Sequence, residues 1–296
     1  MRVFVTGASG FVGSAVVREL RHGGHSVLGL ARSEDAAKKI EASGAEVLHG
    51  NIEDLQSLRA GAEGCDGIIH CGFNHDFSRF QENCDNDRKA IAAMAEVIRG
   101  STRPLIVTSG VALLSGQTVT EDMRAPAESP NPRVATEQAV DAALQTGADV
   151  RVVRLPIVHG DGDHGFIAML IGLAREKGVS AYANDGGNCW PAAHQLDVAR
   201  VYTLALAKGE AGKRYHAVSE AGIALRDIAG VIGRRLGVPV IAKTGAEIEP
   251  HFTWFSHFVQ MNAVASSAWT RDALGWAPTM PGMLADLNAS THYFAG

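Results

Sequence analysis

Short apolar runs alternate with amphipathic segments through the first half of the chain. Such runs are typical of buried strands, and apolar residues three and four positions apart are typical of helices. A helix is expected directly after residue 10, and proline after an N-cap asparagine starts another at Asn131. Strands that alternate with helices form a parallel sheet with crossover helices, so we predict an α/β fold with a Rossmann-type doubly wound sheet. Strands are predicted at 1–5, 26–31, 45–49, 67–71, 105–109 and 150–155, and further helices at 36–43, 89–99 and 131–147.

The alternation becomes looser beyond Gly160. Helical periodicity predicts helices at 166–177, at 197–208 with Asp197 as its N-cap, and at 225–236, and an apolar run predicts a strand at 214–218. We therefore expect a dinucleotide-binding domain over 1–160 and a smaller substrate lobe over 161–296 that can interleave with the first.

The first predicted strand runs into the glycine-rich sequence Thr6–Gly13 before a helix opens. Gly7 allows a tight turn, Gly10 lets the backbone approach a pyrophosphate, and Gly13 lets the helix pack closely on the strand. The helix N-terminus adds unpaired N–H groups and partial positive charge. The motif predicts a bound dinucleotide, and a glycine turn that merely packs is the alternative. The residues expected at the cofactor here are Gly7, Ser9, Gly10, Phe11, Val12 and Gly13.

This motif resembles the extended short-chain dehydrogenases/reductases, which are related to sugar-nucleotide epimerases and dehydratases. Leu274-Gly275-Trp276-Ala277-Pro278 resembles the segment that closes the small substrate-covering lobe of that superfamily. The superfamily's catalytic Tyr-x-x-x-Lys pair is absent, because the tyrosines at 182, 202, 215 and 293 have no lysine four positions later. The resemblance thus covers nearly the whole chain but omits the usual catalytic pair.

Arg32 and Ser33 follow the second predicted strand, where such folds recognise the adenosine ribose. An acidic residue there selects NAD, whereas a guanidinium fork suits a 2′-phosphate. We therefore expect NADP in preference to NAD, the alternative being an exposed arginine at a strand end. The resemblance implies further cofactor contacts from Asn51, Ile52, Cys71, Gly72, Phe73, Thr108, Leu155, Pro156 and Val158.

Arg133 and Glu137 stand where the superfamily has its tyrosine and lysine, and Ser109 directly precedes the position of its catalytic serine, Gly110. Residues four apart share one helical face, so Arg133 and Glu137 should point toward the cofactor. Arg133 can polarise a carbonyl or hold a carboxylate but cannot give up a proton, and Glu137 can bind the nicotinamide ribose. The alternative is an ion pair within the helix.

Several further side chains are candidates for substrate contacts. His75 is expected near the nicotinamide end and is also a catalytic candidate, and Trp190 can stack on a substrate ring or pack in the core. The full set expected at the substrate is His75, Ser109, Arg133, His159, Trp190 and His194. No spacing of His, Asp or Glu predicts a metal site.

Composition narrows the function classes. The 296-residue chain is 46% hydrophobic with 33 glycines, and a formal charge of −5 argues against nucleic-acid binding. No apolar run reaches the length of a membrane helix, no signal segment is expected, and the four cysteines show no Cys-x-x-Cys spacing, so we expect a cytoplasmic protein with reduced thiols. The polar helix from Arg133 predicts a monomer or weak homodimer.

The residues favour an NADP-dependent oxidoreductase that reduces a small carbonyl substrate by hydride transfer without the Tyr-Lys pair. A sugar-nucleotide-type epimerase or dehydratase is an alternative, although that chemistry relies on the missing tyrosine. A cofactor-binding sensor or scaffold without turnover is a third.

Overall fold

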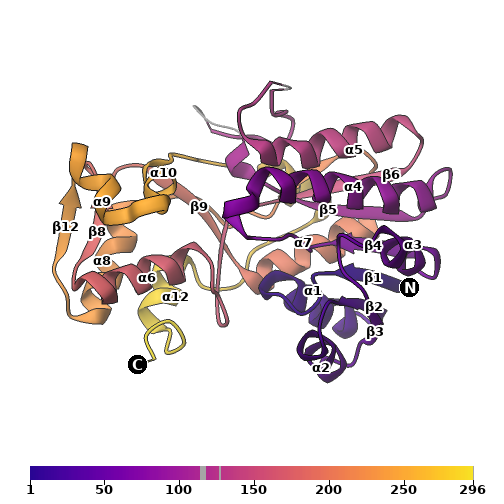
Figure 1. The fold of residues 1–296 in the computed structure, drawn as a ribbon, viewed down its shortest axis with the longest axis horizontal. Helices are drawn as coiled ribbons and strands as arrows, with labels where there is room; N and C mark the ends of the chain where they lie inside the picture. Colours follow the sequence, from indigo (N-terminus) through magenta and orange to yellow (C-terminus); the bar gives the residue numbers. More distant parts are fainter. Residues whose placement is uncertain (114–117, 127, 296) are drawn as a thin grey trace.

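A computed structural model describes residues 1–113, 118–126 and 128–295. Seven parallel strands form its central sheet in the order β10-β6-β5-β4-β1-β2-β3 (Figure 1). The predicted Rossmann-type sheet is confirmed. Its strands are β1 (Arg2–Thr6), β2 (Ser26–Ala31), β3 (Glu46–His49), β4 (Gly67–His70), β5 (Pro104–Gly110), β6 (Asp149–Leu155) and β10 (Arg214–His216).

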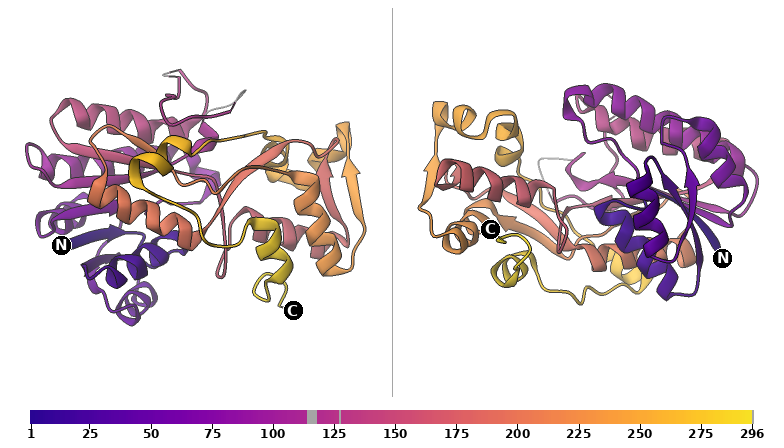
Figure 2. Two further views of the ribbon diagram at one scale, coloured as in Figure 1. Left: turned by 180° about the vertical axis from the view of Figure 1, so that it is seen from behind. Right: turned by 60° about the horizontal axis from the view of Figure 1, so that its bottom comes forward.

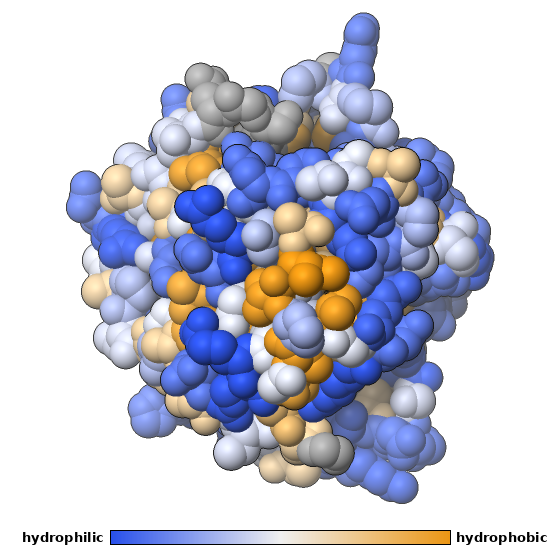
Figure 3. All heavy atoms as spheres, turned by 90° about the vertical axis from the view of Figure 1, so that its left-hand side faces the viewer, coloured by the Kyte–Doolittle hydropathy of each residue, from blue (hydrophilic) through white to orange (hydrophobic). Residues whose placement is uncertain are grey.

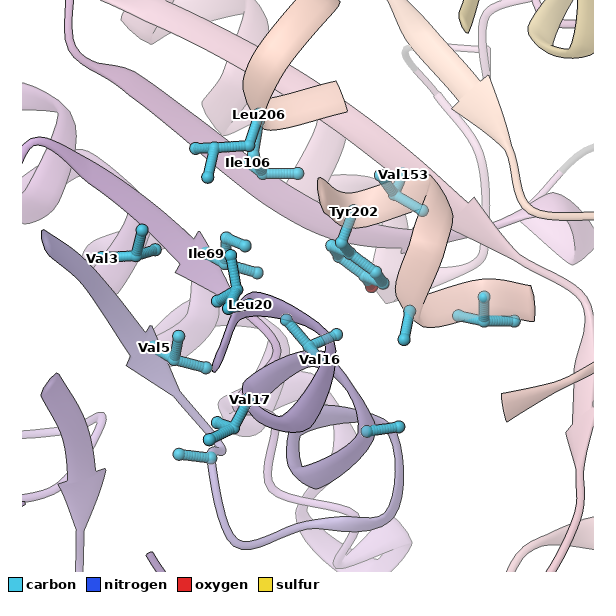
Figure 4. Close-up of a cluster of buried hydrophobic side chains, with 14 of the residues drawn as sticks. Val3, Val5, Val16, Val17, Leu20, Ile69, Ile106, Val153, Tyr202 and Leu206 are labelled. Atoms are coloured by element: carbon cyan, nitrogen blue, oxygen red, sulfur yellow. The ribbon is translucent and has the colours of Figure 1, made fainter. Parts of the chain in front are cut away.

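Helices cover both faces of this sheet, because successive strand side chains point to opposite faces. In β1, Val3 and Val5 pack into one core cluster and Phe4 into the other. Figure 4 shows the first cluster, where α1 and α7 bring Val16 and Tyr202 together. That face is covered by α1 (Phe11–His22), α2 (Glu34–Ala42) and α7 (Gln195–Lys208), and the other by α3 (Leu55–Glu63), α4 (Phe80–Ile98) and α5 (Ala135–Gln145).

A second lobe with its own core lies beyond the carboxyl ends of the sheet strands (Figures 1 and 2). One small sheet has the order β11-β9-β7, and β12 pairs with β8 in another. The strands are β7 (Ile157–His159), β8 (Ser180–Ala183), β9 (Cys189–His194), β11 (Glu220–Ala224) and β12 (Val240–Lys243). The helices are α6 (Phe166–Lys177), α8 (Leu225–Leu236), α9 (Ile248–Phe252), α10 (Ser256–Gln260) and α12 (Met283–Ala289).

The chain returns to the central sheet after it has entered the second lobe. Helix α7 packs against α1, and β10 then completes the edge of the sheet beside β6. Helix α11 (Ala268–Leu274) and Trp276 also join the core of the central sheet. The segment 274–278, expected to close the substrate lobe, therefore packs on the nucleotide-binding body instead. The indole of Trp276 donates to the backbone oxygen of Asp197 over 3.1 Å.

Most predicted elements occur, with informative differences at their ends. The strand at 26–31 and the helices at 166–177 and 225–236 have the predicted bounds. Helix α4 starts at Phe80 rather than at residue 89, because polar residues cover its first turns, and α3 was not predicted. The predicted cap of α7 is wrong: His194 accepts from the Leu196 N–H, whereas Asp197 is buried and binds Arg200 and the Thr279 and Met280 amides.

The outer surface of the second lobe is mixed. Viewed from the end that carries β12 and α9, it shows an apolar patch framed by hydrophilic residues (Figure 3). On β12, Val240 is 40% exposed. Among the described residues, no helix combines the length and the apolar composition needed to cross a bilayer.

Candidate active site

The glycine motif forms the turn between β1 and α1. Gly7 has a φ of +66°, a conformation that residues with a Cβ rarely adopt. A Cβ on Gly13 would lie 2.0 Å from the carbonyl oxygen of Gly7, so only glycine lets α1 begin so close to the turn. These two glycines therefore bring the helix N-terminus to the carboxyl edge of the sheet.

This turn fits a dinucleotide pyrophosphate. Among the described residues no side chain caps α1, so the amides of Phe11, Val12 and Gly13 have neither a helical acceptor nor a capping partner there. A Cβ on Gly10 would meet only the Gly7 oxygen, at 3.2 Å, so packing on the described residues leaves the other side of Gly10 open. Partly buried Ser9 adds a hydroxyl beside this backbone. Unpaired amides at a helix start attract phosphate oxygens.

The neighbouring strand ends carry the other predicted cofactor residues. Arg32 is exposed at the end of β2, and Ser33 uses its oxygen to cap α2 at Ala36. Asn51 uses its side-chain oxygen to close its own turn, and a Cβ on Gly72 would lie 2.9 Å from Ile52. Leu155, Pro156 and Val158 lie where β6 passes into β7.

The hydroxyl groups of Thr108 and Tyr202 form a hydrogen-bonded pair near this edge of the sheet. Thr108 donates its hydroxyl hydrogen to the backbone oxygen of His70 over 2.7 Å, so the Tyr202 hydroxyl, also 2.7 Å away, is the donor toward Thr108. Burial raises the pKa of Tyr202 well above its ordinary value, and burial raises the pKa of the adjacent Cys71 thiol to about 12. Both groups therefore stay protonated and serve packing.

Arg133 belongs to a buried polar chain that we call the Asp87 cluster: Thr6, His70, Asp87, Arg133 and Thr136. The Arg133 Nη1 lies 2.6 Å from Asp87 Oδ2, and Nη2 donates to the Thr108 backbone oxygen over 3.3 Å. His70 Nε2 lies 3.0 Å from Asp87 Oδ1. The guanidinium also lies 3.9 Å above the centre of the Phe73 ring. These contacts hold Arg133 flat beside the end of β5.

The hydrogen bonds define the protonation of this cluster. Thr6 accepts from the Gly72 amide over 3.0 Å, so its hydroxyl hydrogen points to His70 Nδ1, 2.7 Å away. His70 then carries its hydrogen on Nε2 and donates it to Asp87. Burial opposes ionisation of Asp87, but Arg133 and His70 outweigh it and hold the pKa of the carboxyl below its usual range. Asp87 is therefore a fixed anion that positions Arg133.

Glu137 belongs to a different set, which we call the Glu137 cluster: Ser109, Glu137, Asp141, Arg154 and Arg214. Oε1 of Glu137 accepts from Ser109 Oγ at 2.9 Å and Arg154 Nε at 2.7 Å, and Oε2 accepts from Arg154 Nη2 at 2.7 Å and Arg214 Nε at 2.8 Å. Burial opposes ionisation, yet the two guanidinium groups lower the pKa of Glu137 to about 2.

The two clusters revise the predictions for this helix face. Arg133 and Glu137 do not pair with each other, so the intrahelical ion pair that was the alternative for these residues is absent. Both oxygens of Glu137 are occupied by side chains, and only 3% of the residue is exposed, so it has no oxygen left for the nicotinamide ribose. Ser109 is 4% exposed and donates to Glu137, which removes it from direct contact with substrate.

Of the other residues predicted at the substrate, His75 is exposed and Trp190 is buried. His75 is exposed beside Phe73, and its pKa is lowered by desolvation and by the positive charge of Arg133 and His164. Trp190 is fully buried against Phe166 and Phe255, so its expected stacking on substrate is wrong.

His159 and His194 also belong to packed regions. His159 has no exposed surface and lies with Nδ1 2.6 Å from Asp286 Oδ2. His194 caps α7. The His159 ring is therefore closed to substrate in this structure, and the His194 ring packs edge-on against it with centres 5.4 Å apart. No group of three or more potential metal ligands occurs among the described residues.

Asp87, Arg154 and Arg214 are the important residues that the sequence analysis missed. Asp87 lies between Cys84 and Ile91 on the apolar face of α4, and Arg154 interrupts the buried run of β6. A charged residue at a buried position needs a partner, so each of these positions was a signal for an ion pair. The partner itself cannot be identified without the fold.

Comparisons with known proteins agree with this architecture. A profile of the NAD dependent epimerase/dehydratase family matches residues 3–219. An uncharacterised protein of Schizosaccharomyces pombe is 48% identical over 99% of this chain and 100% of its own length. A 4-hydroxy-2-methyl-3-oxo-4-farnesyl-3,4-dihydroquinoline-1-oxide ketoreductase of Stigmatella aurantiaca is 27% identical over 80% of this chain and 74% of its own.

Among solved structures, the dTDP-glucose 4,6-dehydratase DesIV of Streptomyces venezuelae, crystallised with NAD, superposes with a TM-score of 0.81. It is 21% identical, and the match covers 100% of this chain and 97% of that one, so this likeness shows the fold. The phosphate-binding turn, the parallel sheet and the family profile agree with the predicted resemblance. The chain belongs to the NAD dependent epimerase/dehydratase family, within the extended short-chain dehydrogenase/reductase superfamily.

Proposed function

We propose that this protein is an NADP(H)-dependent reductase of a carbonyl compound in which Arg133 acts at the position of the superfamily's tyrosine. The observation that carries the proposal is the seating of Arg133, held by Asp87, the Thr108 carbonyl and the Phe73 ring next to the end of β5. The Arg133 side chain is 16% exposed, whereas that of Asp87, which holds it, is 1% exposed.

A held cation suits the reduction of a carbonyl. Bound NADPH would supply a hydride to the carbonyl carbon and leave as NADP⁺, and a proton from water would complete the alcohol. Arg133 stabilises the negative charge that develops on the carbonyl oxygen, and Asp87 keeps the guanidinium in place so that it need not reorganise. Arg133 cannot itself give the proton, because guanidinium remains charged in proteins.

The choice of NADP rests on the end of β2. Arg32 is exposed and makes no hydrogen bond to another described residue, and no acidic residue stands at the strand end to accept from a ribose hydroxyl. A planar guanidinium is suited to a 2′-phosphate. Arg32 would hold this phosphate, while the amides that open α1 would hold the pyrophosphate.

Calorimetric titration tests the cofactor choice. NADPH should bind more tightly than NADH, and Arg32→Asp should weaken NADPH binding about 10- to 100-fold, the loss of one charged contact of about 1.5–3 kcal/mol. Arg99→Asp, an exposed arginine at the far end of α4, is the matched control and should bind NADPH like the wild type. Tighter binding of NADH would overturn the NADP assignment.

Turnover tests the reaction itself. NADPH oxidation should require a carbonyl substrate and yield one alcohol per NADPH consumed. A substrate altered without net NADPH oxidation would favour the epimerase or dehydratase alternative, and tight cofactor binding without turnover of any carbonyl would favour the sensor alternative.

A further inference from the structure

Aromatic side chains from both lobes meet next to Arg133. Phe73, His75 and Phe77 come from the connection between β4 and α4, Phe80 begins α4, and Trp254 and Phe258 come from the second lobe. We call these six residues the aromatic band. The Phe77 ring stacks on Trp254 with centres 5.5 Å apart and planes 27° apart, and it meets Phe258 edge-on at 6.0 Å.

The band is continuous with the candidate active site. Phe73 lies edge-on to His75 at 5.2 Å and to Phe80 at 6.3 Å, and it also carries the Arg133 guanidinium on its face. Phe77 lies 5.6 Å from Phe80 on the same side. A line of rings therefore runs from the cation at the end of β5 to the second lobe.

Trp254 is unusually exposed to solvent for a large aromatic residue. Its side chain is 54% exposed, although a large aromatic ring usually gains stability by burial. The residue before it, Thr253, has φ +51° and ψ −130°, which is unfavourable for a β-branched residue. Strained backbone of this kind clusters at ligand-binding positions, where the surrounding structure holds it. The exposed ring and the strained residue before it both belong to the segment that closes the band.

The polar groups around the band leave little for a charged ligand. Arg79 pairs with Glu82, and Asp76 accepts from Ser78. Asp87 and Glu137 are buried and paired within their clusters. Among the described residues, Arg133 is the arginine that lies over a ring of the band, and part of its donor capacity is already used. A single oxygen acceptor suits this setting better than the diphosphate of a sugar nucleotide.

We propose that the aromatic band is the substrate site and that it takes a flat, uncharged ring compound with one carbonyl group. The carbonyl oxygen faces Arg133, and the ring system lies along the aromatic band toward Phe77 and Trp254. Trp254 is then a specificity-determining residue contributed by the second lobe. This inference rests on the proposed function for the reaction, but the binding it describes is measurable without turnover.

The test measures binding of 2-acetylnaphthalene to the NADP⁺-bound protein by calorimetry, with oxaloacetate and dTDP-glucose as charged comparisons. Trp254→Ala should weaken binding of 2-acetylnaphthalene about tenfold, a change equal to 1.4 kcal/mol, and Trp254→Phe should restore most of it. Trp269→Ala is the matched control, because Trp269 is 40% exposed and stacks on Tyr215 at 5.4 Å, outside the band. It should bind like the wild type.

A second variant tests whether the strained backbone at Thr253 contributes to ligand binding by Trp254. Thr253→Gly removes the backbone strain, so the melting temperature should rise while 2-acetylnaphthalene binds more weakly, because Trp254 is held less firmly. A variant that is stabilised without loss of binding would remove the strained residue from the argument and count against the proposal.

The outcomes distinguish this inference from the reductase function. Binding that depends on Trp254 supports the aromatic site, and if no carbonyl compound then drives NADPH oxidation, the reductase is overturned while the aromatic site stands. NADPH oxidation by oxaloacetate alone supports the reductase and overturns the aromatic site. Equal affinity in Trp254→Ala and wild type, binding of dTDP-glucose alone, or no binding of 2-acetylnaphthalene also overturns the aromatic site.

Discussion

The Asp87 cluster and the Glu137 cluster use the same kinds of side chain at the same edge of the sheet, yet they differ in what they leave free. Arg133 in the first is 16% exposed, whereas Arg154 and Arg214 in the second are 0% and 1% exposed. In the first cluster the Asp87 carboxylate holds Arg133 at the end of β5. In the second, Arg154 and Arg214 enclose the Glu137 carboxylate. Charged residues four positions apart thus differ: the Arg133 side chain keeps an exposed part, whereas Glu137 becomes the centre of a buried structural brace.

The largest expected effect comes from removing the negative charge of Glu137, the centre of the Glu137 cluster. Glu137→Gln leaves Arg154 and Arg214 buried without their shared anion, and breaking a buried pair in this way costs about 3–5 kcal/mol. The free energy of unfolding, measured with urea, should fall by that amount. Glu63→Gln, an exposed glutamate on α3, is the control and should unfold like the wild type. A stable Glu137→Gln variant with weakened cofactor binding would instead restore the ribose role first predicted for Glu137.

Lowering the pH should weaken the Glu137 cluster and so lower the free energy of unfolding. The folded pKa of Glu137, about 2, lies below its ordinary value of 4.5, so this stabilisation is present above pH 4.5 and is lost as the pH falls toward 2. A depression of this size corresponds to about 3 kcal/mol. Asp87, whose pKa is also lowered, acts in the same direction. Urea unfolding between pH 5 and pH 2.5 should show the loss, and Glu137→Gln should show a shallower slope, whereas Glu63→Gln should keep the wild-type slope.

Substitutions in the Asp87 cluster should lower the rate of turnover. Arg133→Ala removes the cation at the developing oxyanion and should lower kcat/KM about 10- to 100-fold, the loss of a charged hydrogen bond of about 1.5–3 kcal/mol. The NADPH affinity should remain nearly unchanged. Arg133→Lys keeps the charge but not the planar fork, so it should recover only part of the rate.

The control for Arg133 is Arg88→Ala, which removes an exposed arginine on α4 that pairs with Asp85. Circular dichroism must show that each variant is folded at the assay temperature, because Arg133→Ala also leaves Asp87 without its cation. Unchanged kinetics in a folded Arg133→Ala variant would show that both clusters are structural.

The smallest effect is expected at Ser109. Ser109→Ala removes one of the two donors to Glu137 Oε1, and Arg154 continues to occupy that oxygen. The free energy of unfolding should fall by about 1 kcal/mol, with kcat and KM unchanged. A large loss of kcat would mean that Ser109 reaches the substrate and that the Glu137 cluster is part of the catalytic machinery.

The sequence predicted the sheet and the phosphate turn well because both depend on local patterns. Apolar runs define the strands, and Gly7 and Gly13 meet steric demands within a few residues of themselves. The site was harder to predict because its contacts are long-range. Glu137 meets Arg214 across 77 positions in the sequence, and no periodicity identifies such a partner.

The same limit explains the errors at single residues. Helical spacing predicted one shared face for Arg133 and Glu137, but it could not show that Asp87 from α4 would bind Arg133 and that Arg154 from β6 would bind Glu137. Trp190 follows a similar logic, since its sequence context does not show the aromatic residues from α6 and η5 (Thr253–Phe255) that enclose it. Partners from distant elements decided these outcomes.

The late return of the chain to the sheet has a consequence for biosynthesis. Strand β6 gains its outer neighbour only when β10 (Arg214–His216) has been made, and α1 is covered only when α7 has been made. A nascent chain that ends after β6 therefore exposes an unpaired strand edge and the apolar face of α1 on the ribosome. Translation must pass through much of the second lobe before the nucleotide-binding body can close.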